Sequence, residues 1–453
     1  MIKRAITYWK LHTFPILMIF ASLLFYISFG YDLPRTDFFK LLTLYLALFY
    51  LCYKLIQFEK WNFKFLVVSG TLFRLVFLFA EPDLSQDFHR FVWDGQMIVH
   101  GINPYLHLPK DLILDIHHKI PNAMELHKGM GELSASHYSN YPPLNQLIFA
   151  LAALLTGGST LGSLMVMRIV IILADLGIFY FGRKLLSKLN RPPHLIFWYF
   201  LNPLVILELT GNLHFEGVML FFFVASLYLL FQKKWKPAAV LYALSISIKL
   251  IPLIFLPLFL KYFGPRKSIP FFGIIGGVCL LLVLPFHAPE FIANYSRSIG
   301  LWFSNFEFNA GLYNLVKYIG VQWGAKPWEL IKAYGKIIPW IIVSAIVLIT
   351  FIRKNERIDT LITSMLWILS LYYFLSTTVH PWYVIFLVLL CLFTEFRFPI
   401  VWSLTIILSY WAYSNEEYRE NRLLLFIEYI AVYGFMIYEI IRLHNKKLLF
   451  HKN

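Results

Sequence analysis

Apolar runs close to twenty residues long recur throughout this sequence, and they constrain its fold more than any other feature. A helix of about 20 apolar residues crosses the hydrocarbon core of a bilayer. The composition agrees, because 59% of the 453 residues are hydrophobic and only 14% are charged, against about 25% charged residues in soluble domains. The mean hydropathy is +0.65. The sequence therefore predicts an all-α polytopic membrane protein, expected as one integral-membrane domain over residues 1–453.

The Lys and Arg residues, which give a net charge of +15, gather in short loops between the apolar runs. Cytoplasmic loops are enriched in these residues. The pattern predicts about twelve spans with both termini in the cytoplasm, and external loops at 81–141 and 288–335. The sequence contains no long basic run of the kind that would suggest a nucleic-acid partner. The first apolar run is interpreted as a retained helix, because no small-x-small cleavage site follows it.

Two apolar segments differ from simple spans. Residues 142–157 are too few to cross a bilayer, and a re-entrant or interfacial helix is expected there. Residues 237–260 are basic at both ends and are interrupted by Lys249 and Pro252, so we expect a helix that rises, breaks and returns. Lys249 then needs an anionic partner, unless its side chain extends to the membrane surface.

Five polar clusters, far apart in the sequence, fall on the external side of this topology. Polar and ionisable residues at membrane depth are costly and usually mark a site. Their convergence on one face therefore predicts an active site there. The clusters occupy residues 87–94, 139–146, 210–217, 305–311 and 377–383.

The first cluster contains the best catalytic candidate. Ser85 is the expected N-cap of a helix, which puts Asp87 in the first turn, where the helix dipole favours an ionised carboxylate and hence a general base. Arg90 and Asp94 follow on the same face. The neighbouring face is apolar and suits a helix lying in the membrane interface. A solvated charge ladder on an ordinary amphipathic helix explains the same pattern equally well.

Binding candidates come from the other clusters. His214 and Glu216 lie in a short glycine-containing turn between two apolar runs, with Glu208 one or two turns deeper. His380 and Trp382 suggest an aromatic platform for a sugar ring, although an interfacial aromatic belt is the more common explanation for Trp382. Three scattered cysteines form no disulfide framework, and no spacing typical of a metal site is present.

An enzyme on the external face has no ready supply of nucleotide-activated sugars, so its donor must cross the membrane as a lipid. A polyprenyl-phosphate sugar is activated at its anomeric carbon, and its chain can lie against apolar helices. The protein must supply a base for the acceptor hydroxyl and a cation for the departing phosphate. Asp87 fits the first role, and Lys249, Arg90 or Arg297 fits the second.

The segment DFHRFVWDGQMIVHGINPY (87–105), followed by SNYPPL (139–144), resembles the first-loop signature of integral-membrane glycosyltransferases of the GT-C superfamily. The closest pattern is that of polyprenyl-phosphate-mannose-dependent mannosyltransferases. Later segments, NPLVILELTGNLHFEG (202–217) and TTVHPWY (377–383), are similar to bacterial members of the superfamily.

This resemblance implies a GT-C type bundle with interfacial helices in its first loop. It also implies an inverting transfer in which Asp87 is the catalytic base and Asp94 its supporting catalytic neighbour. No cofactor is expected to be required. A divalent metal is possible but not indicated, because Ser85 stands where the mannosyltransferase that adds the first mannose to the GPI anchor has the first aspartate of an Asp-x-Asp pair. The expected substrate-binding residues are Arg90, Asn103, Tyr105, Tyr141, His214, Glu216, Lys249, Glu307, His380 and Trp382.

The sequence thus predicts a mannosyltransferase or other hexosyltransferase that moves a sugar from a polyprenyl-phosphate donor to a lipid-linked or cell-envelope glycan. Its active site is expected on the periplasmic or exterior face of a bacterial inner membrane. Two alternatives stay open. A transporter or flippase of lipid-linked sugars would share the broken helices, but it predicts internal repeats and polar residues near the midplane. A polymerase or ligase of the O-antigen type would share the lipid-linked substrate, but it usually relies on external arginines and histidines.

Overall fold

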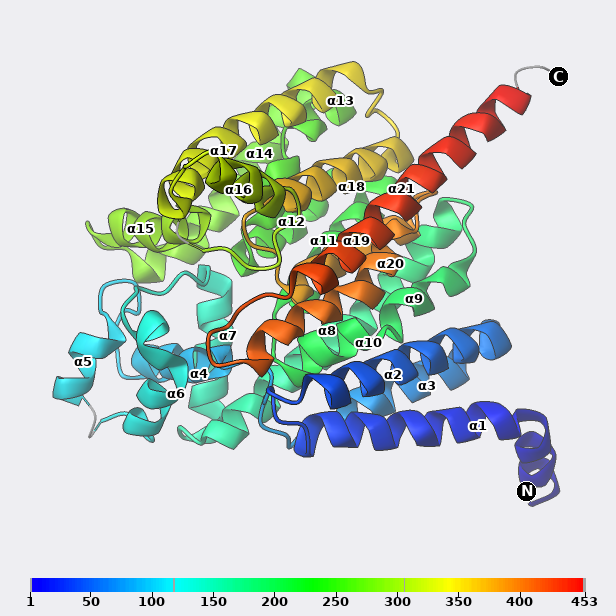
Figure 1. The fold of residues 1–453 in the computed structure, drawn as a ribbon, viewed down its shortest axis with the longest axis horizontal. Coiled ribbons are helices and arrows are strands. Elements are labelled where there is room, and N and C mark those ends of the chain that lie inside the picture. The colour runs from blue at the N-terminus through cyan, green and yellow to red at the C-terminus, as the bar shows by residue number, and fades with distance from the viewer. Residues whose placement is uncertain (1, 117–118, 305, 451–453) are drawn as a thin grey trace.

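The computed structural model describes residues 2–116, 119–304 and 306–450 (Figure 1). Regular structure in these residues is helical, which agrees with the predicted all-α class, and one isolated β-bridge joins Phe308 to Thr378. The first part of the chain forms α1 (Ile2–Tyr31), α2 (Phe38–Glu59), α3 (Phe63–Leu75), α4 (Asp87–Val99), α5 (Pro109–Ile116), α6 (Ala123–Ala135), α7 (Pro143–Thr156), α8 (Thr160–Lys188), η1 (Pro193–Ile196), α9 (Phe197–Phe200), α10 (Pro203–Val205) and η2 (Ile206–Gly211). The rest forms α11 (Glu216–Phe231), α12 (Trp235–Ile248), η3 (Ile251–Phe255), α13 (Leu258–Phe263), α14 (Pro265–Val283), η4 (Leu284–Phe286), α15 (Phe291–Ser304), α16 (Leu312–Gln322), α17 (Pro327–Ile352), α18 (Ile358–Leu375), α19 (Pro381–Leu392), α20 (Phe398–Thr405), η5 (Ile406–Ser414) and α21 (Arg422–Phe450).

The number of helices that can span a membrane is smaller than predicted. Within the described ranges seven helices are long and apolar enough, and one bent pair, with 50° between its halves, would make an eighth. The predicted count of about twelve spans is therefore not confirmed. The seven are Trp9–Tyr31, Phe38–Glu59, Thr160–Lys188, Pro265–Phe286, Pro327–Ile352, Ile358–Leu375 and Arg422–Lys446, and the bent pair is Pro193–Phe200 with Pro203–Gly211.

The difference comes mainly from short apolar helices in the interior. Three of them, α11, α12 and α19, contain 16, 14 and 12 residues, fewer than the ~20 that a span requires. Most of their residues are buried against other helices. A helix that is apolar on every side suits a protein interior as well as a lipid environment, so hydrophobicity alone does not decide whether these helices are spans.

The unusual apolar segments fold largely as predicted. The 142–157 segment is the short helix α7, and its position relative to the membrane stays a prediction. The 237–260 segment breaks after Ile248, where Lys249 takes an extended conformation (φ −147°, ψ 137°) and ends α12. Pro252 then lies at the start of η3, where its missing N–H costs no helical hydrogen bond.

Helix α4 differs from the expected helix in its N-cap and its burial. It begins at Asp87, with Gln86 rather than Ser85 as its N-cap, although Ser85 Oγ accepts a hydrogen bond from the Asp87 N–H at 3.3 Å. The residues from Phe88 to Met97 are buried almost without exception, because α4 packs against α6 and α7. Because Arg90 and Asp94 are buried, the solvated charge ladder is wrong. The position of α4 relative to the membrane interface stays a prediction.

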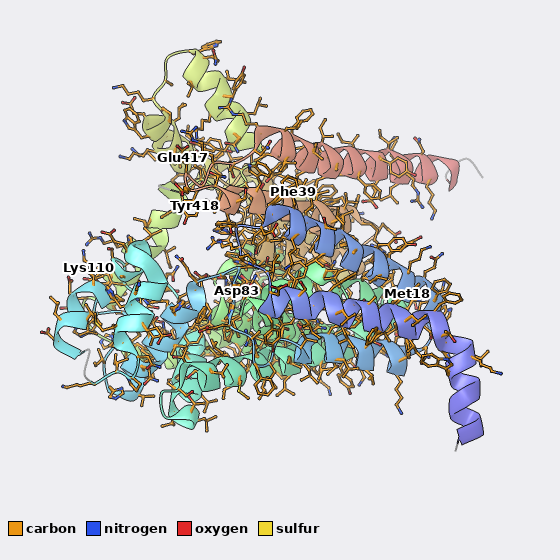
Figure 2. All side chains as sticks on the ribbon, turned by 60° about the horizontal axis from the view of Figure 1, so that its bottom comes forward. Met18, Phe39, Asp83, Lys110, Glu417 and Tyr418 are labelled. Atoms are coloured by element: carbon orange, nitrogen blue, oxygen red, sulfur yellow. The ribbon has the colours of Figure 1, made fainter. Side chains whose placement is uncertain are left out.

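The two external loops gather at one end of the molecule. Figure 1 shows α4, α5, α6 and α15 at that end and both marked chain ends at the other. Figure 2 labels Asp83, where the chain enters the first loop, and Lys110 further out in it. This arrangement fits the predicted path, in which the termini share one side and the large loops the other. Which side faces the cytoplasm stays a prediction.

An ion pair within the helical bundle fixes α3 to α8. Arg74 Nε donates to Asp175 at 2.7 Å, and both side chains are completely buried. Tyr199, in α9, donates from its hydroxyl to the same carboxylate at 2.9 Å. Buried charges are tolerated only when they are paired and hydrogen-bonded. The pair therefore sets the relative position of three elements, α3, α8 and α9, inside the bundle.

Candidate functional site

A cavity of about 740 Å³ lies between the two external loops and the adjoining helix ends. All five polar clusters contribute side chains to its wall, although Asn305 of the fourth cluster lies outside the described residues. The tertiary structure thus brings together segments that are far apart in the chain. The candidate residues in the wall are Asp87, Arg90, Tyr141, His214, Glu216, Lys249, Glu307, His380 and Trp382.

Asp87 stands in the first turn of α4 and is half-buried in the cavity wall. Burial raises the pKa of its carboxyl above the ordinary value of 3.8, whereas Lys249 lowers it, Glu216 raises it and Arg35 lowers it. These effects on the pKa show that two cations, Lys249 and Arg35, and a second carboxylate, that of Glu216, lie close to Asp87. A carboxylate in such surroundings can hold or accept a proton next to a bound molecule.

Lys249 meets the second carboxylate across the cavity wall. Its Nζ donates to Oε1 of Glu216, whose side chain is buried in the first turn of α11. Glu216 is the anionic partner that the sequence required for a lysine at a helix break. Within the described residues, Oε2 of Glu216 has no hydrogen-bond partner. Both residues line the cavity, so the Lys249 ammonium stands there beside a carboxylate that is only partly hydrogen-bonded.

His214 and Glu216 are presented by an unusual turn. The preceding residues form η2, a π-helical turn, a geometry often found at functional sites. The buried guanidinium of Arg168 donates to the carbonyl oxygens of Thr210 (3.0 Å) and Gly211 (3.1 Å). Because these carbonyls end the turn, Arg168 fixes the backbone from which His214 projects.

Glu208, deeper in the same turn, is held by side chains rather than exposed to the cavity. Its Oε1 accepts a hydrogen bond from the Tyr410 hydroxyl at 2.7 Å, and its Oε2 accepts one from Asn212 Nδ2 at 3.0 Å. Nε2 of His214 lies 3.6 Å from Oε2, beyond hydrogen-bonding distance. Glu208 therefore supports the turn. Nε2 of His214 has no hydrogen-bond partner among the described residues.

Trp382 does not form the open aromatic platform that the sequence suggested. Its ring lies 3.8 Å from that of His214 and 4.4 Å from that of His380, with interplanar angles of 18° and 4°. Two rings stacked this close to one indole cannot share a face without overlapping, so they cover opposite faces. Only the edges of these rings are left for a ligand.

Arg90 and Asp94 form a buried pair at the base of the wall. Arg90 Nε donates to Asp94 Oδ1 at 2.7 Å, and Asp94 Oδ2 accepts from Ser139 (2.6 Å) and Gln146 (2.9 Å). Asp94 is completely buried and is absent from the described cavity wall. Its position fits an internal anchor for α4 and α7 rather than contact with a substrate.

Asn103 and Tyr105 are likewise absent from the described wall. Asn103 Nδ2 donates to the Phe286 carbonyl at 2.9 Å, which joins the first external loop to η4. The Tyr105 hydroxyl donates to the carbonyl oxygen of Tyr141 at 2.6 Å. The Gly-x-x-Pro-Tyr turn thus positions Tyr141, whose own side chain lines the cavity.

Arg35 lines the cavity but was not singled out from the sequence. It lies in the short connection between α1 and α2, and its guanidinium carbon is 3.5 Å from the centroid of the Tyr413 ring. One signal pointed to it: Arg35 is a cation in a loop that the predicted topology places outside, where the positive-inside rule expects few. Tyr413, from η5, was missed because its apolar surroundings make it look like a membrane-belt residue.

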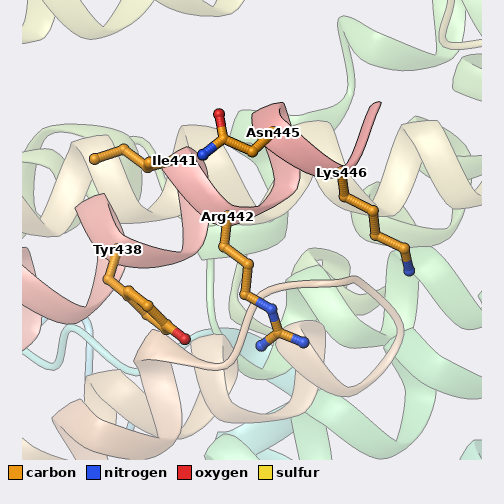
Figure 3. Close-up of a pocket in the computed structure, with 5 residues that line it drawn as sticks. All are labelled: Tyr438, Ile441, Arg442, Asn445 and Lys446. Atoms are coloured by element: carbon orange, nitrogen blue, oxygen red, sulfur yellow. The ribbon is translucent and has the colours of Figure 1, made fainter. Parts of the chain in front are cut away.

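Two further observations bear on the site. Across the part of the chain that the structure describes, no group of three or more His, Cys, Asp or Glu residues is arranged to hold a metal ion. Figure 3 shows a shallow hollow on α21 whose lining, including Arg442 and Lys446, comes from a single helix. It is remote from the five polar clusters, so it is not considered part of the candidate site.

Comparisons with known proteins point to one activity. Residues 38–263 match a family described as alpha-(1->6)-mannopyranosyltransferase, N-terminal domain. The chain is also 22% identical over 198 residues to alpha-(1->6)-mannopyranosyltransferase A of Corynebacterium glutamicum, a match that covers 42% of this chain and 38% of the relative. The predicted resemblance to mannosyltransferases is thereby confirmed, and both descriptions agree with the predicted enzyme class, a glycosyltransferase. The matched region contains the first three polar clusters and Lys249.

Proposed function

We propose that this membrane protein transfers a mannosyl residue from a polyprenyl-phosphate-linked donor to a hydroxyl group of a lipid-linked or cell-envelope glycan. The reaction takes place on the periplasmic or exterior face of a bacterial inner membrane. One observation carries the proposal: Asp87, Lys249 and Arg35 come from three separate segments and meet in one cavity. The similarity of residues 38–263 to a mannosyltransferase family supports mannose as the transferred sugar.

The chemistry needs one base and a stabilised leaving group. Asp87 accepts the proton of the acceptor hydroxyl as that oxygen attacks the anomeric carbon. The bond between this carbon and the phosphate oxygen breaks, and the phosphate leaves with the bonding electrons. Lys249 and Arg35 stabilise the charge that develops on the phosphate. A single displacement of this kind inverts the anomeric configuration.

The rest of the wall suits a lipid-linked substrate. Beside the charged residues it contains the apolar side chains of Phe91, Met219, Leu250, Ile251 and Phe386. Ligand sites commonly combine such surfaces with a few polar groups that fix orientation. The first isoprene units of the donor can therefore lie on protein while the remaining chain stays in the bilayer.

The decisive experiment is a transfer assay on the purified protein in liposomes with host glycolipid acceptors. Radiolabelled polyprenyl-phosphate-mannose is compared with guanosine-diphosphate-mannose as donor. We expect label to reach the acceptor from the lipid donor alone. Transfer from the nucleotide donor alone would contradict the proposed donor class. Failure with several lipid-linked sugars, by a protein that moves those lipids across the bilayer, would instead establish the transporter alternative.

On the acidic side of the pH profile, the fall in kcat/KM should follow the ionisation of Asp87. The base acts only when ionised, so kcat/KM should fall as the pH drops through the pKa of Asp87, which burial raises above 3.8. Lys249 lowers that pKa, so Lys249→Met should move the limb to higher pH. Profiles of log(kcat/KM) against pH for the two proteins measure this shift. A limb at the same pH in both would contradict the assignment.

Transfer is also expected to proceed without a bound divalent metal. The activating charges in this proposal are the two cationic side chains, Lys249 and Arg35, rather than a metal ion. We therefore expect excess EDTA to leave the initial rate unchanged. A rate that falls with EDTA and returns when Mg²⁺ or Mn²⁺ is added would show that a metal takes part.

A further inference from the structure

One exposed tyrosine of the cavity wall has an unusual backbone conformation. Tyr418 lies in the connection between η5 and α21, lines the cavity and is 67% exposed. Figure 2 labels it together with its neighbour Glu417. The φ angle of Tyr418 is 52°, in the left-handed region that bulky residues rarely occupy. Strained residues persist only where their surroundings hold them, and they cluster at active sites and ligand clamps.

Hydrogen bonds hold the loop on both sides of Tyr418. Asn415 Oδ1 accepts a hydrogen bond from the Arg419 N–H at 2.8 Å, and Asn415 Nδ2 donates to the Arg419 carbonyl at 3.0 Å. The Tyr418 N–H donates to the Asn415 carbonyl at 3.2 Å. Further along, the Glu420 carboxylate accepts a hydrogen bond from the Asn309 N–H. The loop is thus closed on itself and joined to the second external loop, so the tyrosine is held in its strained conformation before any ligand binds.

A row of aromatic rings connects Tyr418 to the interior of the cavity. Its ring meets that of Tyr413 edge-on at 6.2 Å, and the Tyr413 ring lies 5.6 Å from that of Tyr410. All three line the cavity, and they change from buried at Tyr410, through half-buried at Tyr413, to exposed at Tyr418. Because Arg35 lies against Tyr413, the row leads from a cation proposed to stabilise the phosphate to the open end of the cavity.

The charge around Tyr418 is unfavourable for the phosphate of the donor. Glu416 and Glu417 are exposed beside it, and Arg419 is paired with Glu417. Like charges repel, so an anionic group is disfavoured at this loop. A neutral sugar meets no such repulsion. The faces of a pyranose carry C–H groups that pack against an aromatic ring, and a tyrosine offers a large apolar surface with a polar tip.

We infer that Tyr418 binds a sugar of the acceptor glycan that lies beyond the sugar receiving mannose. This inference rests on the proposed function and adds a residue that selects acceptors by length. The donor sugar is attached directly to the phosphate, so Lys249 and Arg35 hold it at the inner end of the row. The acceptor hydroxyl must approach Asp87 in the same wall. Tyr418 is the outermost ring of the row, and the next unit of the acceptor can therefore stack on it.

The test removes the ring without straining the loop. Tyr418→Gly can keep the positive φ at no steric cost, and Tyr418→Phe keeps the ring. Transfer is measured to octyl mannosides with one, two or three mannosyl units. For the two longer acceptors we expect Tyr418→Gly to raise KM about ten-fold or more, whereas KM for the one-unit acceptor and for the lipid donor stays unchanged. Tyr418→Phe should behave like wild type.

Two controls separate lost binding from lost structure. The unfolding midpoint of Tyr418→Gly in detergent should not fall, because the substitution relieves backbone strain. Tyr318→Ala should leave every KM unchanged, since Tyr318 is 55% exposed in α16 and is not among the residues of the cavity wall. The inference is overturned if Tyr418→Gly changes KM equally for acceptors of every length, changes only the donor KM, or changes neither.

A binding measurement keeps the inference testable if the proposed function fails. Should the wild type transfer no mannose to any acceptor, saturation-transfer NMR with mannotriose examines the sugar site alone. A signal that is present in wild type, retained in Tyr418→Phe and lost in Tyr418→Gly supports Tyr418 as a sugar-binding residue. An equal signal in all three proteins, or none in wild type, overturns it.

Discussion

Replacing Asp87 with asparagine is expected to slow mannosyl transfer by about 10²–10⁴-fold, the usual contribution of a general base. The amide has nearly the same shape as the carboxylate but cannot accept the proton of the acceptor hydroxyl. Within the described residues, Asp87 makes no buried ion pair comparable to those of Asp94 or Asp175, so the fold should be retained. Initial rates with saturating lipid donor, together with the thermal unfolding midpoint in detergent, measure the two effects separately.

Asp83→Asn provides the control for this substitution. Asp83 belongs to the same loop, is exposed, and is not among the residues of the cavity wall. Its substitution should leave the rate unchanged. Equal transfer by Asp87→Asn and wild type would remove Asp87 from the chemistry. Glu216 and His380 would then become the candidates for the base, since both lie in the same wall.

Arg90→Met is expected to give the largest loss of stability. Breaking a buried ion pair by removing one partner costs about 3–5 kcal/mol, because the other charge stays buried. Here Asp94 would keep only Ser139 and Gln146 as partners. Arg90 Nη1 also donates to the carbonyls of Ser134 and His137, at 2.7 and 2.9 Å, and these bonds would be lost too. Thermal and denaturant unfolding in detergent measure the change.

The exposed pair of Arg357 and Asp359 gives a matched control, with 79% and 39% of the two side chains exposed. Solvent screens such pairs, and Arg357→Met should cost at most about 1 kcal/mol. The double variant Arg90→Met, Asp94→Leu should recover part of the loss, because no charge remains buried. Equal destabilisation by Arg90→Met and Arg357→Met would show that the buried pair contributes no special stability.

The polar clusters show how far the sequence could lead towards the site. The positions of Lys and Arg in short loops grouped the five clusters on one face, and the structure brings all five into one cavity. The same reasoning could not separate Asp87, in the cavity wall, from Asp94, which is completely buried. Both are aspartates on one helix face, and only the packing of α4 against α6 and α7 distinguishes them. Arg35 was missed because a single arginine in a short loop belongs to no motif, although a cation in a predicted external loop departs from the positive-inside rule.

Local physical chemistry explains what the sequence determined by itself. Apolar runs gave the all-helical class and the membrane location, and the break at Lys249 followed from a lysine and a proline within such a run. Each of these conclusions depends on neighbouring residues and on one general property of the surroundings, the lipid. The family resemblance likewise depended on short continuous motifs.

The tertiary structure alone decided which helices are buried in protein rather than exposed to lipid, because apolar side chains suit both surroundings equally well. It also decided which polar groups form ion pairs with one another and which have no hydrogen-bond partner. Arg90 with Asp94 is an internal pair, and Lys249 with Glu216 faces the cavity. Among the described residues, His214 Nε2 and His380 Nδ1 have no hydrogen-bond partner. Pairing depends on distances between residues that are remote in the chain, and no pattern within one segment contains those distances.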